Sequence, residues 1–321
     1  MKPTKSFSTL PESFNRIGAV WFAVAGLYAL ASIHSPAMFQ YGQVLNLLQV
    51  AAFLGIIAIG QTFVLLVGGI DLSQAGVVTL VNILSTSIMV GKAENIVEAV
   101  ILCLFVSLFV GFINGLLITI FRVTPLITTL SMNSLVYGSA LVYTGGMPHG
   151  KIAPAFEFLG QGHFLGIPVT GIVWLTLAIS IGYASLHTIY GRWIYAVGAN
   201  PQAARLMGIP VNSVLISAYM MSSLFACLGA LVLTSYIGLP SLGIGDQFLL
   251  TSIAAVVVGG TALTGGVGSV FGTIGGTLFI TILSSYTRLI NQPIGIQFML
   301  QGLIIALSVL MYRLVQKNRL G

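Results

Sequence analysis

The chain carries very little charge. Of its 321 residues only 6% are Asp, Glu, Lys or Arg, while 57% are hydrophobic. A soluble domain has about a quarter charged residues, so this composition excludes an ordinary water-facing surface. The stretch 17–70 contains no charged residue, and neither do 247–287 and 289–312. Because one helical crossing of a bilayer needs about 20 mostly apolar residues, the sequence predicts an all-α integral membrane protein.

Groups that do chemistry are scarce as well. Cys103 and Cys227 both lie inside apolar runs, which favours buried thiols over a disulfide framework. The four histidines lack metal-ligand spacing, and no nucleophile stands near a base. The segment 145–152 has the glycines and lysine of a phosphate loop but lacks its Ser or Thr. We therefore expect no enzymatic activity, no metal and no cofactor bound by this chain.

Apolar runs alternate with polar breaks in a way that predicts about ten crossings. Several of them are short or interrupted by Gly and Pro, notably the third, fifth and eighth. Broken helices are tolerated in a bilayer only where protein or a watery cavity covers their backbone, so they indicate a solute pathway. The predicted spans are 17–33, 44–67, 72–90, 98–120, 125–143, 169–187, 212–235, 246–260, 266–286 and 296–312.

The basic residues predict the orientation of these spans. The net charge of +6 would suggest nucleic acid in a soluble chain, but here the basic residues form no patch and separate apolar runs. With ten spans and both termini inside, most of them fall in cytoplasmic segments, as the positive-inside rule requires. The inside set is Lys2, Lys5, Arg16, Arg122, Arg192, Arg205, Arg313, Lys317 and Arg319, and the outside set is Lys92, Lys151 and Arg288.

Neither face has room for a folded domain. We predict one transmembrane domain over 1–321, with a cytoplasmic N-terminal segment at 1–16 and a cytoplasmic tail at 313–321. The longest outer loop is 144–168, and the longest inner loop is 188–211, which looks helical from Pro201 to Met207 and has Gly208 as a helix stop. Energy coupling and solute capture must then come from other chains.

Asp71 is the one acid in an unusual setting. It follows two glycines and opens the third predicted span. As a helix N-cap it would accept bonds from backbone N–H groups, and as a pathway residue it would be a functional charge inside the membrane. The segment 67–73 also resembles 258–264, pairing Gly68 with Gly259, and both duplication and chance account for that.

Three segments carry a family resemblance. The sequence Gly-Gly-Ile-Asp-Leu-Ser at 68–73 resembles the GGIDLS segment of the ribose, xylose and autoinducer-2 class of ABC transporter permeases. The inner loop 191–209 is similar to that family's GRxxYAxGxNxxAAxxxGI pattern, and the glycine-rich stretch 253–273 agrees as well. The matches are ordered along the chain from about Asn46 to the last span.

The resemblance implies a type II importer-like permease in the bacterial inner membrane. It implies a second permease chain, identical or not, a cytoplasmic ABC ATPase that binds the ATP and magnesium, and a periplasmic solute-binding protein. It also implies that the short inner helix docks into the ATPase. The expected docking residues are Arg192, Asn200, Ala203, Ala204, Arg205, Gly208 and Ile209.

A solute pathway should be lined by polar side chains on the broken spans, since an unpaired polar group facing lipid is costly. The candidates are Asn46, Gln49, Gln61, Asp71, Ser73, Thr128, Ser131 and Asn133. The alternative is that these groups tie helices together. The chain also departs from the family pattern: Leu249 and Thr251 replace acidic residues, and Ser284, Ser285 and Arg288 stand where asparagines are common. This chain must therefore handle its solute differently if those family groups serve the pathway.

Together these features predict an importer subunit for a neutral, sugar-like solute, because the spans offer almost no charge to a cation or phosphate. Three alternatives remain. A branched-chain amino-acid permease is related, an ion-coupled secondary transporter would need more intramembrane ionisable groups, and a passive channel would have no ATPase partner.

Overall fold

A computed structural model describes residues 12–320. Over that range the chain is almost wholly helical, with two very short strands. The helices are α1 (Glu12–His34), α2 (Tyr41–Leu66), α3 (Gln74–Met89), α4 (Ile96–Thr119), α5 (Pro125–Thr144), α6 (Pro154–Gln161), α7 (Val169–His187), α8 (Ile189–Ala199), α9 (Pro201–Leu206), α10 (Val211–Ile237), α11 (Phe248–Val258), α12 (Val270–Leu289) and α13 (Ile294–Leu320).

Each of the ten predicted spans corresponds to a helix of the structure: α1 to α5, α7 and α10 to α13. Among residues 12–320, five helices are long and apolar enough to cross a membrane by length and composition alone. Four of them are α2, α7, α10 and α12, and the fifth joins the 3₁₀ turn at 93–95 to α4. Shorter apolar stretches lie in α1, α3, α11 and α13. This confirms a multi-span all-α architecture.

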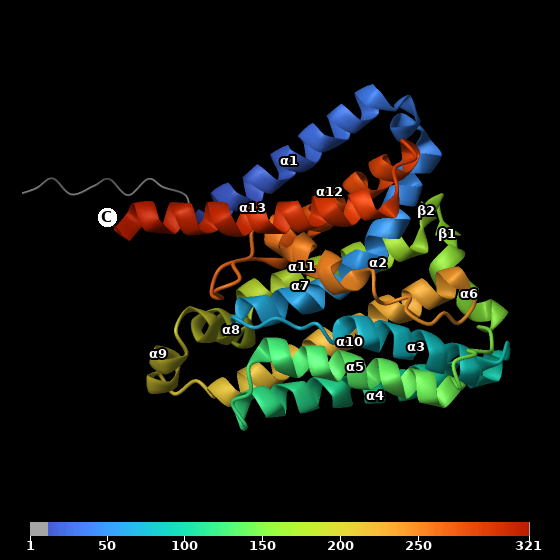
Figure 1. Ribbon diagram of the computed structural model, residues 1–321, viewed down its shortest axis with the longest axis horizontal. Coiled ribbons are helices and arrows are strands. Elements are labelled where there is room, and N and C mark those ends of the chain that lie inside the picture. The colour runs from blue at the N-terminus through green and yellow to red at the C-terminus, as the bar shows by residue number, and fades with distance from the viewer. Residues whose placement is uncertain (1–11, 321) are drawn as a thin grey trace, which may run out of the picture.

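The two ends of the helical bundle carry different elements (Figure 1). The beginning of α1, the end of α13, α8 and α9 lie at one end, whereas α6 and the β1–β2 hairpin lie at the other. The two predicted loops 144–168 and 188–211 are thus on opposite ends, as ten crossings require. Residues 1–11 and 321 of the predicted terminal segments lie outside the described residues, while 12–16 and 313–320 continue α1 and α13 as helix.

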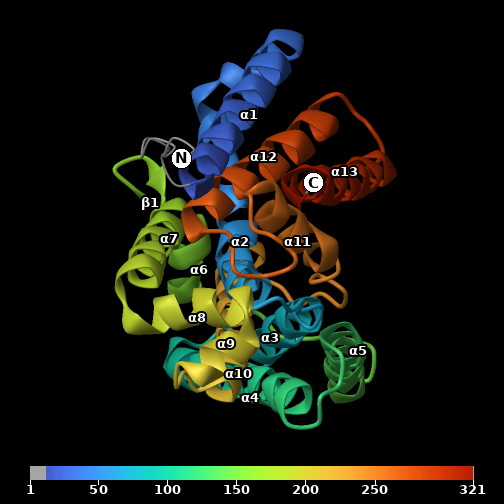
Figure 2. The same cartoon turned by 90° about the vertical axis from the view of Figure 1, so that its left-hand side faces the viewer.

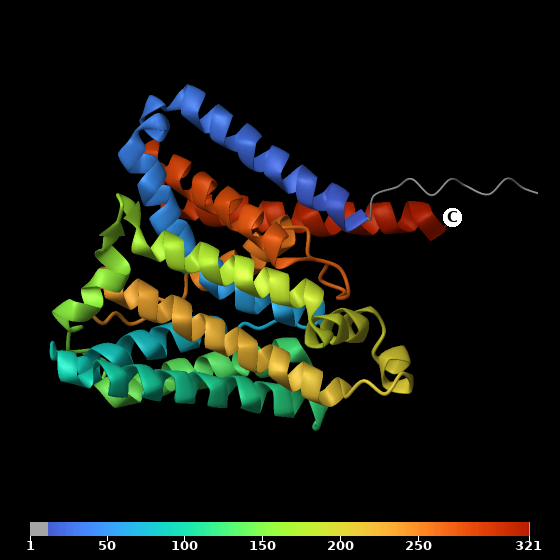
Figure 3. The ribbon, with the colours of Figure 1, turned by 180° about the vertical axis from the view of Figure 1, so that it is seen from behind.

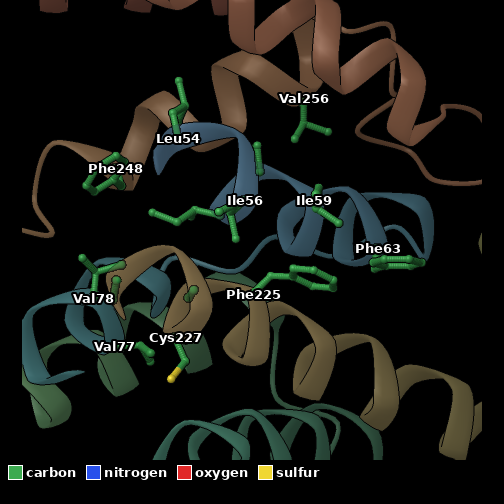
Figure 4. Close-up of a cluster of buried hydrophobic side chains, with 14 of the residues drawn as sticks. Leu54, Ile56, Ile59, Phe63, Val77, Val78, Phe225, Cys227, Phe248 and Val256 are labelled. Carbon is green, nitrogen blue, oxygen red and sulfur yellow. The ribbon is translucent and has the colours of Figure 1, made fainter. Parts of the chain in front are cut away.

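Helix α2 forms the centre of the bundle. In its apolar stretch 83% of the residues are buried, compared with 28% in α4, which presents Phe105 and Phe109 outward as a lipid-facing helix would. The long helix α10 packs most extensively on α4 and α2 and runs beside α4 along the back of the molecule (Figure 3). Side chains of α2, α3, α10 and α11 meet in the main hydrophobic cluster, including Ile59, Val78 and Phe225 (Figure 4).

The two predicted loops contain more structure than we expected. The outer loop includes α6 and a hairpin in which β1 (His163–Phe164) pairs with β2 (Ile167–Pro168). The inner loop begins with α8, which the sequence did not lead us to expect. Gly191, Ile194 and Val197 are its buried face, and this spacing of three was the available signal.

Candidate functional site

Two of the core helices stop inside the protein in the same way. At the end of α2 the N–H of Gly68 donates to the carbonyl of Leu65, and the N–H of Gly69 donates to that of Val64. At the end of α11 the N–H groups of Gly260 and Thr261 donate to Val257 and Val256. This is the Schellman motif, whose left-handed residue favours glycine; Gly68 has φ +80° and Gly260 has φ +88°. Structure therefore pairs Gly68 with Gly260, one residue away from the pairing in the sequence.

The two interrupted regions touch each other through backbone. The N–H of Gly266, in the loop 259–269 between α11 and α12, donates to the carbonyl of Leu66 at 2.8 Å. From α8, Gly198 packs so closely that an added Cβ would collide with that same carbonyl and lie 2.6 Å from the nitrogen of Gly266. The hydroxyl of Tyr195 donates to the carbonyl of Gly268 at 3.0 Å. The inner loop is thus in direct contact with both helix breaks, and we call this contact the glycine node.

Asp71 lies in the non-helical segment after α2 and is completely buried. Its Oδ1 accepts bonds from the N–H and the hydroxyl of Ser73, at 2.8 and 2.6 Å. Its Oδ2 accepts a bond from the hydroxyl of Ser222 on α10 at 2.6 Å. Asn114 on α4 donates to Ser73, and Gln74 donates to Ser222. The carboxylate therefore links the non-helical segment between α2 and α3 directly to α10, and through Ser73 to α4.

This geometry resembles the capping alternative in one respect, since Asp71 does accept the N–H of Ser73 near the start of α3. The bond to α10 goes further than a local cap. Nearby, the hydroxyl of Tyr219 and Oδ1 of Asn114 are buried with no partner among the described residues. Asp71 and Ser73 remain proposals as pathway residues, and their hydrogen bonds are those of an interhelical tie.

The other pathway candidates are dispersed. Asn46 and Ser131 are exposed, while Gln49 donates to the carbonyl of Gly160 at 2.8 Å and Oδ1 of Asn133 accepts from the N–H of Gly76 at 2.6 Å. Thr128 bonds within its own helix. Gln61 is wholly buried, and neither of its amide atoms has a partner within 12–320. The contacts of Gln49 and Asn133 join helices, and within 12–320 no hydrogen bond links one of these six side chains to another.

The predicted docking residues belong to α8, α9 and the turns that follow them, which project at one end of the molecule in Figure 1 and face the viewer in Figure 2. Oδ1 of Asn200 accepts the N–H groups of Gln202 and Ala203, both at 3.0 Å, which caps α9. Ala204 is buried, whereas Arg192, Ala203, Arg205 and Gly208 are exposed and Ile209 is partly buried. Arg205 donates to Asn212 at 3.3 Å.

The tip of this projection is more apolar than the sequence led us to expect. Leu206 is 91% exposed and Met207 is 68% exposed, and neither was among the predicted docking residues. Leu206 is the last residue of α9 and Met207 follows it, and Gly208 comes next with φ +79°. Exposed apolar side chains that lie together are typical of a protein contact surface, and Leu206 and Met207 are neighbours.

A cavity of about 300 Å³ lies between α2, α11, α12 and α13. Thr251, Ser284 and Arg288 line it, and these are three of the five positions at which the sequence departs from the family pattern. The sequence alone does not indicate that these positions share a site, since α11 and α12 meet only in the folded bundle. The connection of α12 to α13 places the cavity toward the end opposite α8 and α9 (Figure 1).

A many-spanning helical bundle with paired helix breaks and a capped, projecting inner loop is the architecture of a membrane transport protein. The chain belongs to the permease family described as "Branched-chain amino acid transport system / permease component", which it matches over residues 43–309. This family membership confirms the assignment as a permease that is not itself an enzyme.

Curated relatives align with nearly the whole chain. The ribose import permease protein RbsC of Bacillus subtilis is 38% identical over 290 residues, covering 89% of each chain. The protein of the same name from Escherichia coli K12 is 35% identical over 296 residues, covering 90% of this chain and 91% of its own length. The fructose import permease protein FrcC of Rhizobium meliloti is 32% identical over 302 residues, covering 92% and 84%. No solved structure matches the chain.

Proposed function

We propose that this chain is the membrane-spanning subunit of an ATP-driven importer for a sugar or a similar neutral polyhydroxy solute. The observation that carries the proposal is the similarity to ribose and fructose import permeases along nearly the whole chain. The described spans support it, because they hold little charge that could bind a cation or a phosphate.

The importer would contain three other kinds of chain: a second permease, a cytoplasmic ATPase and an extracytoplasmic solute-binding protein. In this proposal α9 docks into the ATPase through its exposed apolar tip. Movement of α9 would reach the helix breaks through α8 and the glycine node, because Gly198 lies against Leu66 and Gly266. Such a device gives alternating access without a covalent step in this chain.

The orientation belongs to the same proposal. The end with α8 and α9 carries Arg192, Arg205, the beginning of α1 and the end of α13, and it would face the cytoplasm of a bacterium. The hairpin and α6 would face the periplasm. The chain would therefore lie in the inner membrane with both termini inside.

The test is uptake by the assembled importer in proteoliposomes that contain ATP. We expect transport of a neutral sugar from a panel that includes D-ribose, D-xylose and D-fructose, and no transport of L-leucine or L-isoleucine. Uptake of the amino acids alone would favour the related amino-acid permease function, which the family description names. Uptake of any solute without ATP would contradict an ATP-driven importer.

A further inference from the structure

The cavity between α2, α11, α12 and α13 has the lining of a carbohydrate site. Its buried hydroxyl groups come from Thr251, Thr281 and Ser284, whose residues are at most 9% exposed. Its more exposed members bring amides and one guanidinium: Gln247, Gln292, Gln297 and Arg288. Hydroxyls deep inside and longer donors at the mouth can bind the hydroxyl groups on two sides of a small ring.

Apolar walls complete this cavity. Phe53 and Phe248 are nearly buried, and Phe298 is 48% exposed. An aromatic ring offers a flat apolar surface to the C–H face of a sugar. A volume of about 300 Å³ is at the small end of ligand pockets, which are typically about 300–1,000 Å³ with few polar groups among apolar ones. The cavity therefore suits a single sugar ring better than a disaccharide.

Several polar groups of the cavity are free to bind a ligand. Among residues 12–320 the hydroxyls of Thr281 and Ser284 make no hydrogen bond, whereas the hydroxyl of Thr251 donates to the carbonyl of Gln247 in its own helix. Arg288 uses its Nε to donate to the carbonyl of Ser284 at 3.2 Å, which leaves its two terminal nitrogens. These form a planar fork of donors that can bind two neighbouring oxygen atoms.

The charge of the lining indicates the kind of solute. One guanidinium stands beside three amides and three hydroxyls, and within the described chain no Asp or Glu lines the cavity. The lining therefore offers nothing to a cation, whereas an uncharged polyhydroxy solute can use all of its polar groups. The lone guanidinium would also attract an acidic sugar, and the experiment below includes one. Arg288 also has a simpler role, since a cation in the last turn of a helix stabilises the helix dipole, so its contribution to binding must be measured.

Resting on the proposed function, we propose that this cavity is a binding site for a neutral monosaccharide within a single permease chain. The solute would bind between α11 and α12 at the end opposite the ATPase-docking helix. Its hydroxyls would accept bonds from Arg288 and Ser284 and donate to the hydroxyl oxygen of Thr251, whose own proton is donated to the carbonyl of Gln247. The residues at which the chain departs from the family pattern would then set its solute preference.

A thiol-protection experiment tests the site. In the complete importer, Cys103 and Cys227 are replaced by Ala and Ser284→Cys is introduced, with Ser241→Cys as the control in the exposed loop before α11. A small water-soluble thiol reagent is applied with D-ribose, D-xylose, D-fructose, D-gluconate or L-leucine. We expect one or more neutral sugars to slow labelling at Ser284→Cys by about tenfold or more, as for a hydrogen-bonded ligand, and to leave Ser241→Cys unchanged.

Other outcomes separate this inference from the proposed function. Protection by D-gluconate alone would overturn the neutral-solute assignment. If a sugar is taken up but none protects Ser284→Cys, the site is wrong while the proposed function stands. If no sugar is taken up at all, both fail.

Two substitutions examine the site without a label. Arg288→Gln removes the donor fork and Ser284→Met fills the cavity, and we expect each to reduce sugar uptake about tenfold at saturating binding protein. Arg122→Gln makes the same change in the exposed turn before α5, where uptake should not change. The thermal unfolding midpoint of each variant is measured in parallel. Unchanged uptake in Arg288→Gln and Ser284→Met, or the same loss in Arg122→Gln, would overturn the proposal.

Discussion

The N–H of Gly266 donates to the carbonyl oxygen of Leu66 at 2.8 Å, joining two helix breaks that are 200 residues apart in the chain. Gly198 of α8 lies against the same bond, since an added Cβ would collide with the carbonyl. The obstructing atoms are backbone, which cannot rotate away as a side chain can. The inner loop can therefore pack against this hydrogen bond only because Gly198 has no side chain.

We predict that Gly198→Ala destabilises the protein by about 1–3 kcal/mol, the usual cost of overpacking. Gly138→Ala in α5 is the matched control, because no atom lies within 4 Å of its added Cβ and alanine favours a helix over glycine. Thermal unfolding in detergent measures both. If Gly198→Ala unfolds at the same temperature as Gly138→Ala, the close contact at the glycine node is wrong.

The bonds of Asp71 predict different results for two substitutions. Asp71→Asn keeps an oxygen for Ser73 and places an amide against Ser222, so we expect stability within about 1 kcal/mol of the original and most of the uptake. Asp71→Ala leaves the buried hydroxyls of Ser73 and Ser222 without their acceptor, which should lower the free energy of unfolding by about 1–3 kcal/mol for each group. Unfolding midpoints and uptake are compared for the two.

A pathway charge would behave in the opposite way. If Asp71 served the solute through its negative charge, Asp71→Asn would abolish uptake while the protein stayed folded. That outcome would contradict the role as an interhelical tie.

The exposed tip of α9 predicts where the ATPase binds. We expect Ala203→Trp to leave the permease folded but to reduce the amount of ATPase that copurifies, because Ala203 is exposed beside Leu206 and bulk there blocks close approach. Gly208→Trp should do the same, with an added backbone cost at φ +79°. Ala203→Ser and Gly208→Ala are the smaller controls, and normal copurification in both tryptophan variants would reject the docking assignment.

The orientation predicts the behaviour of reporter fusions. A reporter that is active only in the periplasm should be inactive when fused to the C-terminus and active when inserted near Lys151, in the loop between α5 and α6. The opposite pattern at either position would refute ten crossings with cytoplasmic termini.

Much of the fold was predictable from sequence, because each predicted crossing corresponds to a local run of apolar residues. The short helices α6 and α8 were missed, since eight and eleven residues do not give the long apolar signal on which span prediction rests. The cap of α9 was predictable from Asn200, Pro201 and Gly208, which lie close together in the chain.

The candidate sites were less predictable, because they are made by contacts between distant segments. Nothing in the local sequence indicates that Ser222 bonds to Asp71, or that Gly198 lies on Leu66. Thr251 and Ser284 stood out as departures from the family pattern, but only the packing of α11 against α12 shows that they face one cavity.

The last prediction concerns the polar residues on the broken spans. Exposure divides them, since Asn46 and Ser131 are exposed while Gln61 and Thr128 are buried. Exposure to lipid and exposure to water look alike in the structure, but a small water-soluble thiol reagent reacts only from water. We expect Asn46→Cys and Ser131→Cys, on a background without Cys103 and Cys227, to be labelled, and labelling to differ between nucleotide-free and ATP-bound importer. Gln61→Cys is the buried control and should stay unreactive in both states. If Asn46→Cys and Ser131→Cys also stay unreactive while uptake continues, these side chains face lipid or other helices, and the pathway lies elsewhere in the bundle.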